Sequence, residues 1–287
     1  MEFNRHQTLT KKGETRMNIF NKFCNLLVAA FIIIGTTNSA SAGSVIDDVV
    51  KRGKLVVGVA TFVPWAMRDK QGDLIGFEVD VSQQLAKDMG VEVELVPTAW
   101  DGIIPALLAG QFDVIITGMV QKPSRNLTIN FSKPYAYLNV GMAANKALAD
   151  KDGLKSMEDW NSSKVTLTIK RGTAPGETAA RLFPKARVRQ FDDDAQALQD
   201  VLNGNAHAFL TSEPKPAYYV IDNPEVLYHP FGVGPFDPSA SAFAVRKGDP
   251  DALNFFDNWI QYRSLDGWLE NTHAKWFQSR DWKNQVK

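Results

Sequence analysis

Four predicted strands end in residues that could bind a small polar molecule. These strand ends are Phe62 to Trp65, Trp100, Thr117 to Arg125, and Gly172-Thr173. Open α/β sheets bind their ligands at the carboxyl ends of their strands. A lone arginine and a glycine turn can hold an anion, whereas aromatic rings offer apolar contact or cation–π attraction. Three ends come from one half of the chain and the fourth from the other, which predicts a binding cleft between two lobes.

The motifs of common enzymes are missing from the sequence. It contains no G-x-S-x-G, no P-loop, no H-E-x-x-H, and no G-x-G-x-x-G after a strand. His207, His229 and His273 lack the spacing of metal ligands, and His207 is interpreted as a structural histidine within a strand. We therefore expect no catalytic residue, no metal and no cofactor.

Alternating strand and helix patterns position the first three strand ends. Helix 76–90 places Val81, Leu85 and Met89 on one face, and Asp101 is predicted to cap the next helix. Glu78 and Asp80 are carboxylates suited to a helix N-terminus. The predicted strands are 54–60, 91–97 and 112–117, which gives a βαβαβ unit.

The same pattern recurs in the second half of the chain. Strands are predicted at 165–169, 186–191 and 207–210, with helices at 177–183 and near 198–202, the latter capped by Asp192, Asp193 or Asp194. Two such units predict two parallel-sheet lobes with helices on both faces. Strand 242–246 and helices 250–262 and 265–277 follow, and we expect this segment to pack on the first lobe.

An export signal is predicted at the N-terminus. Leu26 to Ile34 is an apolar run of signal-peptide length, and Ala40-Ser41-Ala42 is a small-x-small cleavage pattern. We expect removal of residues 1–42, so that the mature chain starts at Gly43. The single cysteine, Cys24, lies in this leader, and a mature chain without cysteine fits a bacterial periplasm.

Charge and length limit the kind of partner. Lys plus Arg and Asp plus Glu both total 32, so no field of one sign indicates nucleic acid or an anionic membrane. The remaining length of about 245 residues suits two lobes of roughly 100 residues each. We expect a small-molecule partner and a monomer.

Three longer motifs resemble those of one family. They are G-F-E-V-D-V-x-x-x-L-A at 76–86, W-D-G-I-I-P-A-L-x-x-G-x-F-D-V-I at 100–115, and T-G-M-x-x-x-x-x-R with F-S-K-P-Y at 117–135; A-V-R-K-G-D-P at 244–250 adds a fourth segment. From Leu55 to Phe277 the chain resembles the periplasmic solute-binding proteins that deliver polar amino acids to ABC importers.

The resemblance implies the type 2 periplasmic binding protein fold. Two doubly wound α/β lobes would be joined by two hinge strands near 140–146 and 231–237, and the cleft would close on its ligand. Lobe 1 would comprise residues 43–142 and 235–287, and lobe 2 would comprise residues 143–234. Membrane permease subunits would be the macromolecular partners.

The resemblance also implies the ligand-binding residues. Arg125 matches the arginine that pairs with a ligand α-carboxylate, and Gly172 and Thr173 match the second-lobe turn that holds the same group. Phe62 and Trp100 match two aromatic positions that sandwich the ligand side chain. The full predicted set is Phe62, Trp100, Thr117, Gly118, Arg125, Arg171, Gly172, Thr173 and Ser212.

Several positions depart from the family pattern. Ser212 stands where most members carry the aspartate that holds the α-ammonium group, and Glu213 beside it should point to the opposite face of a strand. Val120 and Lys122 replace common hydroxyl residues, and Arg171 replaces an uncharged polar residue and could add a second positive contact. These changes argue against a standard α-amino acid as the ligand.

We therefore expect a non-enzymatic, periplasmic component of an ABC importer that binds a small carboxylate-bearing solute, an amino acid or a derivative. One alternative is an enzyme on the same scaffold, similar to cyclohexadienyl dehydratase, with Glu213 as its acid. A soluble ligand sensor for a membrane receptor is a third possibility.

Overall fold

The computed structural model describes residues 43–232 and 237–286. The described residues from Ser44 onward belong to one compact unit. The predicted leader, residues 1–42, lies outside the described residues. Within them, no helix has the length and apolar character needed to cross a membrane.

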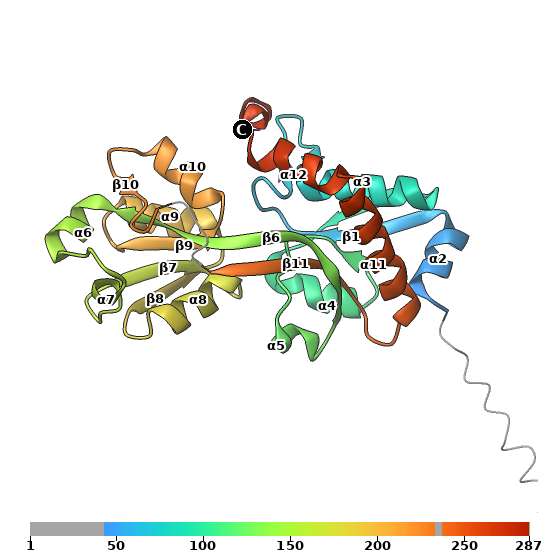
Figure 1. The fold of residues 1–287 in the computed structure, drawn as a ribbon, viewed down its shortest axis with the longest axis horizontal. Coiled ribbons are helices and arrows are strands. Elements are labelled where there is room, and N and C mark those ends of the chain that lie inside the picture. Colours follow the sequence, from blue (N-terminus) through green and yellow to red (C-terminus); the bar gives the residue numbers. More distant parts are fainter. Residues whose placement is uncertain (1–42, 233–236, 287) are drawn as a thin grey trace, which may run out of the picture. The chain divides into compact units, whose positions relative to one another are not determined.

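The first lobe comprises the elements up to α5 together with the C-terminal helices (Figure 1). Its N-terminal elements are α2 (Val45–Arg52), β1 (Lys54–Val59), β2 (Met67–Arg68), β3 (Leu74–Ile75), α3 (Phe77–Met89), β4 (Glu92–Pro97), the 3-10 turn η1 (Trp100–Gly102), α4 (Ile103–Leu108), β5 (Val114–Ile115) and α5 (Pro123–Asn126). Its C-terminal elements are α11 (Pro250–Leu265), α12 (Trp268–Phe277) and η2 (Asp281–Gln285). The predicted βαβαβ order is present.

The second lobe comprises the elements from α6 to β10. They are α6 (Lys146–Asp152), α7 (Met157–Trp160), β7 (Thr166–Lys170), α8 (Ala174–Leu182), β8 (Arg187–Phe191), α9 (Asp194–Leu202), β9 (Ala208–Ser212), α10 (Lys215–Asp222) and β10 (Leu227–Tyr228). Two long strands, β6 (Asn130–Asn145) and β11 (Pro238–Val245), run side by side between the lobes (Figure 1).

Nine strands of the described ranges form one mixed sheet, in the order β4-β1-β5-β11-β6-β9-β7-β8 with β10 beside β6. The strands within each predicted βαβαβ unit are parallel, as expected. However, β6 and β11 are antiparallel to their neighbours. The α/β fold class is confirmed, but its sheet is mixed because the two long connecting strands join the two parallel sets.

Strand β6 changes its partner along its length. Residues up to Asn139 pair with β11, and residues from Val140 onward pair with β9. The chain thus passes from one set of strands to the other near the start of the predicted hinge at 140–146. The second predicted hinge, 231–237, includes residues 233–236, which lie outside the described residues.

The hydrophobic core divides in the same way as the strands. Trp65, Phe77 and Phe256 are buried in the first lobe, and Trp160 and Phe209 are buried in clusters of the second. Helix α11 packs on β6 and α2. The C-terminal segment therefore completes the core of the first lobe, as predicted.

Local capping groups determine where several helices begin. The Ser44 hydroxyl accepts from the Ile46 N–H at the start of α2, and the Asp193 carboxylate accepts from the Gln196 N–H at the start of α9. Of the three aspartates considered, Asp193 is therefore the cap. The predicted cap of α4 by Asp101 is wrong, because Gly102 occupies the N-cap and Asp101 lies within the preceding 3-10 turn.

Glu78 is a buried acid rather than an exposed helix-terminal charge. Its exposed fraction is 0%, and the Tyr135 hydroxyl donates a hydrogen bond to Oε1. The backbone N–H of Gly118 in turn donates to the Tyr135 hydroxyl, with 3.1 Å between nitrogen and oxygen. Burial raises the pKa of Glu78 to about 8, so it is protonated and neutral at pH 7.

This buried acid makes folding stability depend on pH. Between pH 4.5 and about 8 the folded protein retains a proton that the unfolded chain has lost. As the pH rises through this range, the free energy of unfolding therefore falls by about 1.4 kcal/mol per pH unit. Glu78→Gln keeps an acceptor for Tyr135 and removes this proton. In urea unfolding from pH 5 to 9, the free energy of unfolding of the variant minus that of the wild type should rise up to about pH 8 and then stay constant. A difference that is constant across this range would contradict the assignment.

Candidate functional site

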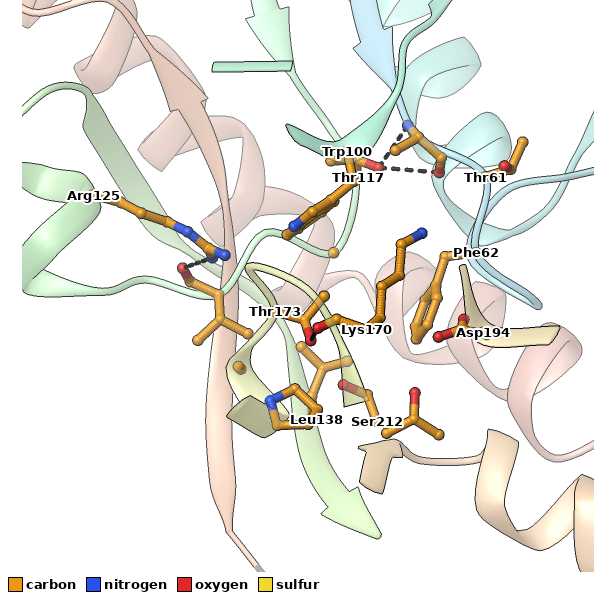
Figure 2. Close-up of a pocket in the computed structure, with 16 residues that line it drawn as sticks. Thr61, Phe62, Trp100, Thr117, Arg125, Leu138, Lys170, Thr173, Asp194 and Ser212 are labelled. Carbon is orange, nitrogen blue, oxygen red and sulfur yellow. Dashed lines mark hydrogen bonds between the residues drawn. The ribbon is translucent and has the colours of Figure 1, made fainter. Parts of the chain in front are cut away.

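A pocket lies at the carboxyl ends of strands from both lobes (Figure 2). Its free volume is about 50 Å³, because side chains of the two lobes already meet around it. The lining residues are Ala60, Thr61, Phe62, Trp100, Thr117, Gly118, Val120, Arg125, Leu138, Lys170, Thr173, Ala174, Pro175, Asp194, Thr211 and Ser212.

The structure brings most of the predicted residues together. Seven of the nine line the pocket: Phe62, Trp100, Thr117, Gly118, Arg125, Thr173 and Ser212. Gly172 does not line the pocket, but its carbonyl oxygen accepts hydrogen bonds from Trp100 and Arg125, which do. Arg171 is exposed and does not line the pocket; its Nε lies 3.1 Å from Asp192 Oδ1.

Arg125 is held at the junction of the two lobes by neutral groups. Its Nη1 donates to the Val120 carbonyl at 2.9 Å, and its Nη2 donates to the Gly172 carbonyl at 3.0 Å. Its guanidinium carbon lies 5.3 Å from the ring centroid of Trp100. Burial lowers the pKa of Arg125 from its ordinary value. Within the described residues Arg125 forms no ion pair, so this partly desolvated cation can accept a carboxylate.

The turn at Gly172 forms the second-lobe side of this contact. Gly172 adopts a φ of 70°, a left-handed conformation that favours glycine. Its carbonyl oxygen accepts from both Arg125 and the Trp100 indole, the latter at 3.2 Å. Thr173 is the N-cap of helix α8, but its hydroxyl does not cap the helix and donates instead to the Lys170 carbonyl at 2.6 Å. That hydroxyl stabilises the turn itself.

Two predicted polar groups on the first-lobe wall already have partners. The Thr117 hydroxyl accepts from the Ala60 N–H at 2.8 Å and donates to the Ala60 carbonyl at 3.2 Å. The Gly118 N–H donates to the buried Tyr135 hydroxyl. Both residues line the pocket, and these bonds hold the ends of β1 and β5 in place.

Lys122, one of the departures from the family pattern, forms an ion pair between the lobes. It is 8% exposed, and its Nζ lies 2.9 Å from Glu177 Oε1 on α8. The lysine therefore faces the second lobe beside the pocket. A hydroxyl residue at this position would be too short to make this contact.

Three charged residues of the site were missed in the sequence. Asp194 and Lys170 line the pocket, and Lys215 forms a buried ion pair with Asp194. A run of three aspartates before one helix was the available signal for Asp194, because only one of them can be the cap. Lys170 ends a buried strand, and its position at the carboxyl end of β7 could have identified it.

Glu213 faces away from the pocket, as its alternation with Ser212 predicts. Its Oε1 lies only 2.0 Å from the position that a β-carbon on Gly141 would occupy. Burial raises the pKa of Glu213 to about 7. The glutamate therefore packs against β6, outside the set of residues that line the pocket.

His207 is a structural histidine, as predicted. Its Nδ1 accepts from the Thr166 N–H at 3.1 Å, and its Nε2 lies 2.9 Å from Asp152 Oδ2. Both ring nitrogens therefore have protein partners. In the part of the chain that the structure describes, no group of His, Cys, Asp and Glu side chains is arranged to hold a metal ion.

Comparison with known proteins gives consistent matches over this fold. Residues 55–279 match the model of the bacterial extracellular solute-binding proteins, family 3. The L-cystine-binding protein of Escherichia coli K12 is 30% identical over 253 residues, which cover 88% of this chain and 93% of that protein.

Two solved structures are also similar. One is an ancestral amino acid-binding protein described as a precursor of cyclohexadienyl dehydratase, with 38% identity, a TM-score of 0.72, and coverage of 82% of this chain and 100% of that one. The other is a candidate ABC-transporter binding component from Wolinella succinogenes in complex with lysine, with 36% identity, a TM-score of 0.74, and coverage of 81% and 99%. The chain belongs to the bacterial extracellular solute-binding proteins of family 3.

Proposed function

We propose that this chain is the periplasmic solute-binding component of an ABC importer. It binds a small carboxylate-bearing solute, an amino acid or a derivative, and acts as a monomer that delivers the solute to membrane permease subunits. The observation that carries the proposal is Arg125, a partly desolvated cation at the meeting point of two lobes, with only carbonyl acceptors among the described residues.

Closure of the two lobes accompanies binding in this proposal. Residues 43–142 and 235–287 form lobe 1 and residues 143–234 form lobe 2, with strand β6 passing between them. Arg125 and Trp100 come from the first lobe and Gly172 from the second, so a solute held by both sides favours the closed arrangement. The predicted contacts from Phe62, Thr173 and Ser212 belong to the same proposal.

An enzyme related to cyclohexadienyl dehydratase is the second candidate. The favouring observation is Glu213, whose pKa of about 7 suits proton transfer near neutral pH. A general acid must reach its substrate, however, and Glu213 is not among the residues that line the pocket. Binding without turnover is therefore the better-supported function. Prephenate turnover by the purified protein, abolished in Glu213→Gln, would reverse this preference.

Removal of Arg125 should abolish binding. Loss of one partner of a desolvated charge pair costs about 2–5 kcal/mol, whereas loss of a solvated surface charge costs under about 1 kcal/mol. Calorimetry with a panel of amino acids and small dicarboxylates first identifies a ligand for the wild type. Arg125→Ala should then weaken its binding by at least about 30-fold, and the exposed control Arg187→Ala should not. Near-wild-type affinity of a folded Arg125→Ala protein would refute the carboxylate role.

Ligand binding should also make the protein more compact. Solution scattering should give a smaller radius of gyration with saturating ligand than without it, because contacts from both lobes are made only in the closed state. Arg125→Ala, at the same ligand concentration, should retain the larger value. An unchanged profile for the wild type at saturation would contradict closure.

A further inference from the structure

The aromatic rings of the pocket already hold cations that belong to the protein. Lys215 Nζ lies 3.8 Å from the ring centroid of Phe62, and the Arg125 guanidinium lies over Trp100. These are the two rings expected to sandwich a ligand side chain. Because Lys215 and Arg125 already lie over the faces of these rings, a cationic ligand would meet a positive charge of the protein at both rings.

Asp194 does not offset the remaining positive charge. Its Oδ2 forms an ion pair with Lys215 Nζ, and Lys215 is only 6% exposed. A buried lysine of this kind needs its carboxylate partner, since an unpaired ammonium group in the interior is strongly destabilising. The negative charge of Asp194 is therefore matched within the protein.

Lys170 is a further cation that faces the pocket. Its side chain extends from the end of β7 toward the space between Trp100 and Phe62 (Figure 2). In the ranges described, Lys170 forms no ion pair with a carboxylate. Because Lys215 and Asp194 neutralise each other, the two positive charges of Arg125 and Lys170 remain uncompensated in the pocket.

We infer that the pocket selects a small solute with two acidic groups, one for Arg125 and one for Lys170. This inference rests on the proposed function and specifies its substrate class as a dicarboxylate, with or without an amino group. A second carboxylate would neutralise Lys170 in a site partly removed from water, where charge pairs interact more strongly than in bulk solvent. A lysine-like or arginine-like solute would instead add a third unmatched positive charge.

Pairs of ligands that differ only in charge test the inference. The probes are L-glutamate with L-glutamine, and glutarate with its monoamide, because each amide has nearly the size of its acid; succinate and adipate extend the length series. L-lysine is the cationic probe. Calorimetry should show each acid binding at least about tenfold more tightly than its amide, and L-lysine binding most weakly. Comparison of glutamate with glutarate reports whether the amino group contributes.

The Lys170→Gln variant locates the second acidic group. In this variant the affinity for each acid should exceed that for its amide by no more than about threefold, because the ammonium charge that pairs with the second acidic group is gone. The control is Lys164→Gln, an exposed lysine just before β7, at the other end of the strand from the pocket. This control should retain the wild-type ratio. Circular dichroism and thermal melting verify that both variants are folded.

The outcomes separate this inference from the proposed function. If amides or L-lysine bind as tightly as the acids, and Arg125→Ala abolishes that binding, the two-acid selectivity is wrong while the binding function stands. An acid preference that persists in Lys170→Gln overturns the role of Lys170. If no carboxylate in the panel binds to the wild type, the proposed function and this inference both fail.

Discussion

The carbonyl oxygen of Gly172 connects the two halves of this protein at its pocket. It accepts hydrogen bonds from the Arg125 guanidinium and from the Trp100 indole, both on the opposite lobe. The carbonyl can face them because Gly172 has a φ of 70°, which a residue with a β-carbon rarely adopts. One backbone conformation in the second lobe thus holds two first-lobe side chains in place at the pocket.

The first-lobe side of the pocket is held together by hydrogen bonds within that lobe. Thr117 bonds to both polar backbone groups of Ala60, and Gly118 is anchored through Tyr135 to the protonated Glu78. These bonds satisfy buried polar groups that would otherwise be costly. They place the carboxyl ends of β1 and β5 side by side, so the residues that follow each strand meet at one site.

Charge in the pocket is distributed between paired and unpaired groups. Lys215 is paired with Asp194 in the second lobe, and Lys122 is paired with Glu177 across the lobes. Among the described residues, Arg125 donates hydrogen bonds to carbonyl groups only and forms no ion pair. Such an arrangement combines internal ion pairs with cations that the proposed function assigns to the ligand. Unpaired cations that are partly removed from water destabilise the empty protein. For the same reason, a solute that neutralises them gains more binding free energy than it would at a solvent-exposed site.

The sequence alone determined the order of elements, the fold class and most of the pocket. Hydrophobic periodicity and glycine stops are local signals, so β1, α3 and β4 lie within a few residues of their predicted bounds. The motif around Arg125 and the strand-end residues Phe62 and Trp100 were recognisable without coordinates. Their positions at strand ends imply a common edge of the sheet.

Only the tertiary structure decided which polar groups remain available and which charges are paired. Glu78 looked like a helix-terminal carboxylate, yet folding buries it completely beside Tyr135, a residue distant in sequence, and this burial raises its pKa so that it is a neutral acid. Asp193 and Asp194 are indistinguishable as neighbours in sequence, but one caps a helix and the other pairs with Lys215. The antiparallel placement of β6 and β11 was likewise invisible. The contacts of Glu78, of Asp194 and of the β6–β11 pair each join residues distant in sequence. Local patterns carry no information about the dielectric environment or the partner that folding provides at these positions.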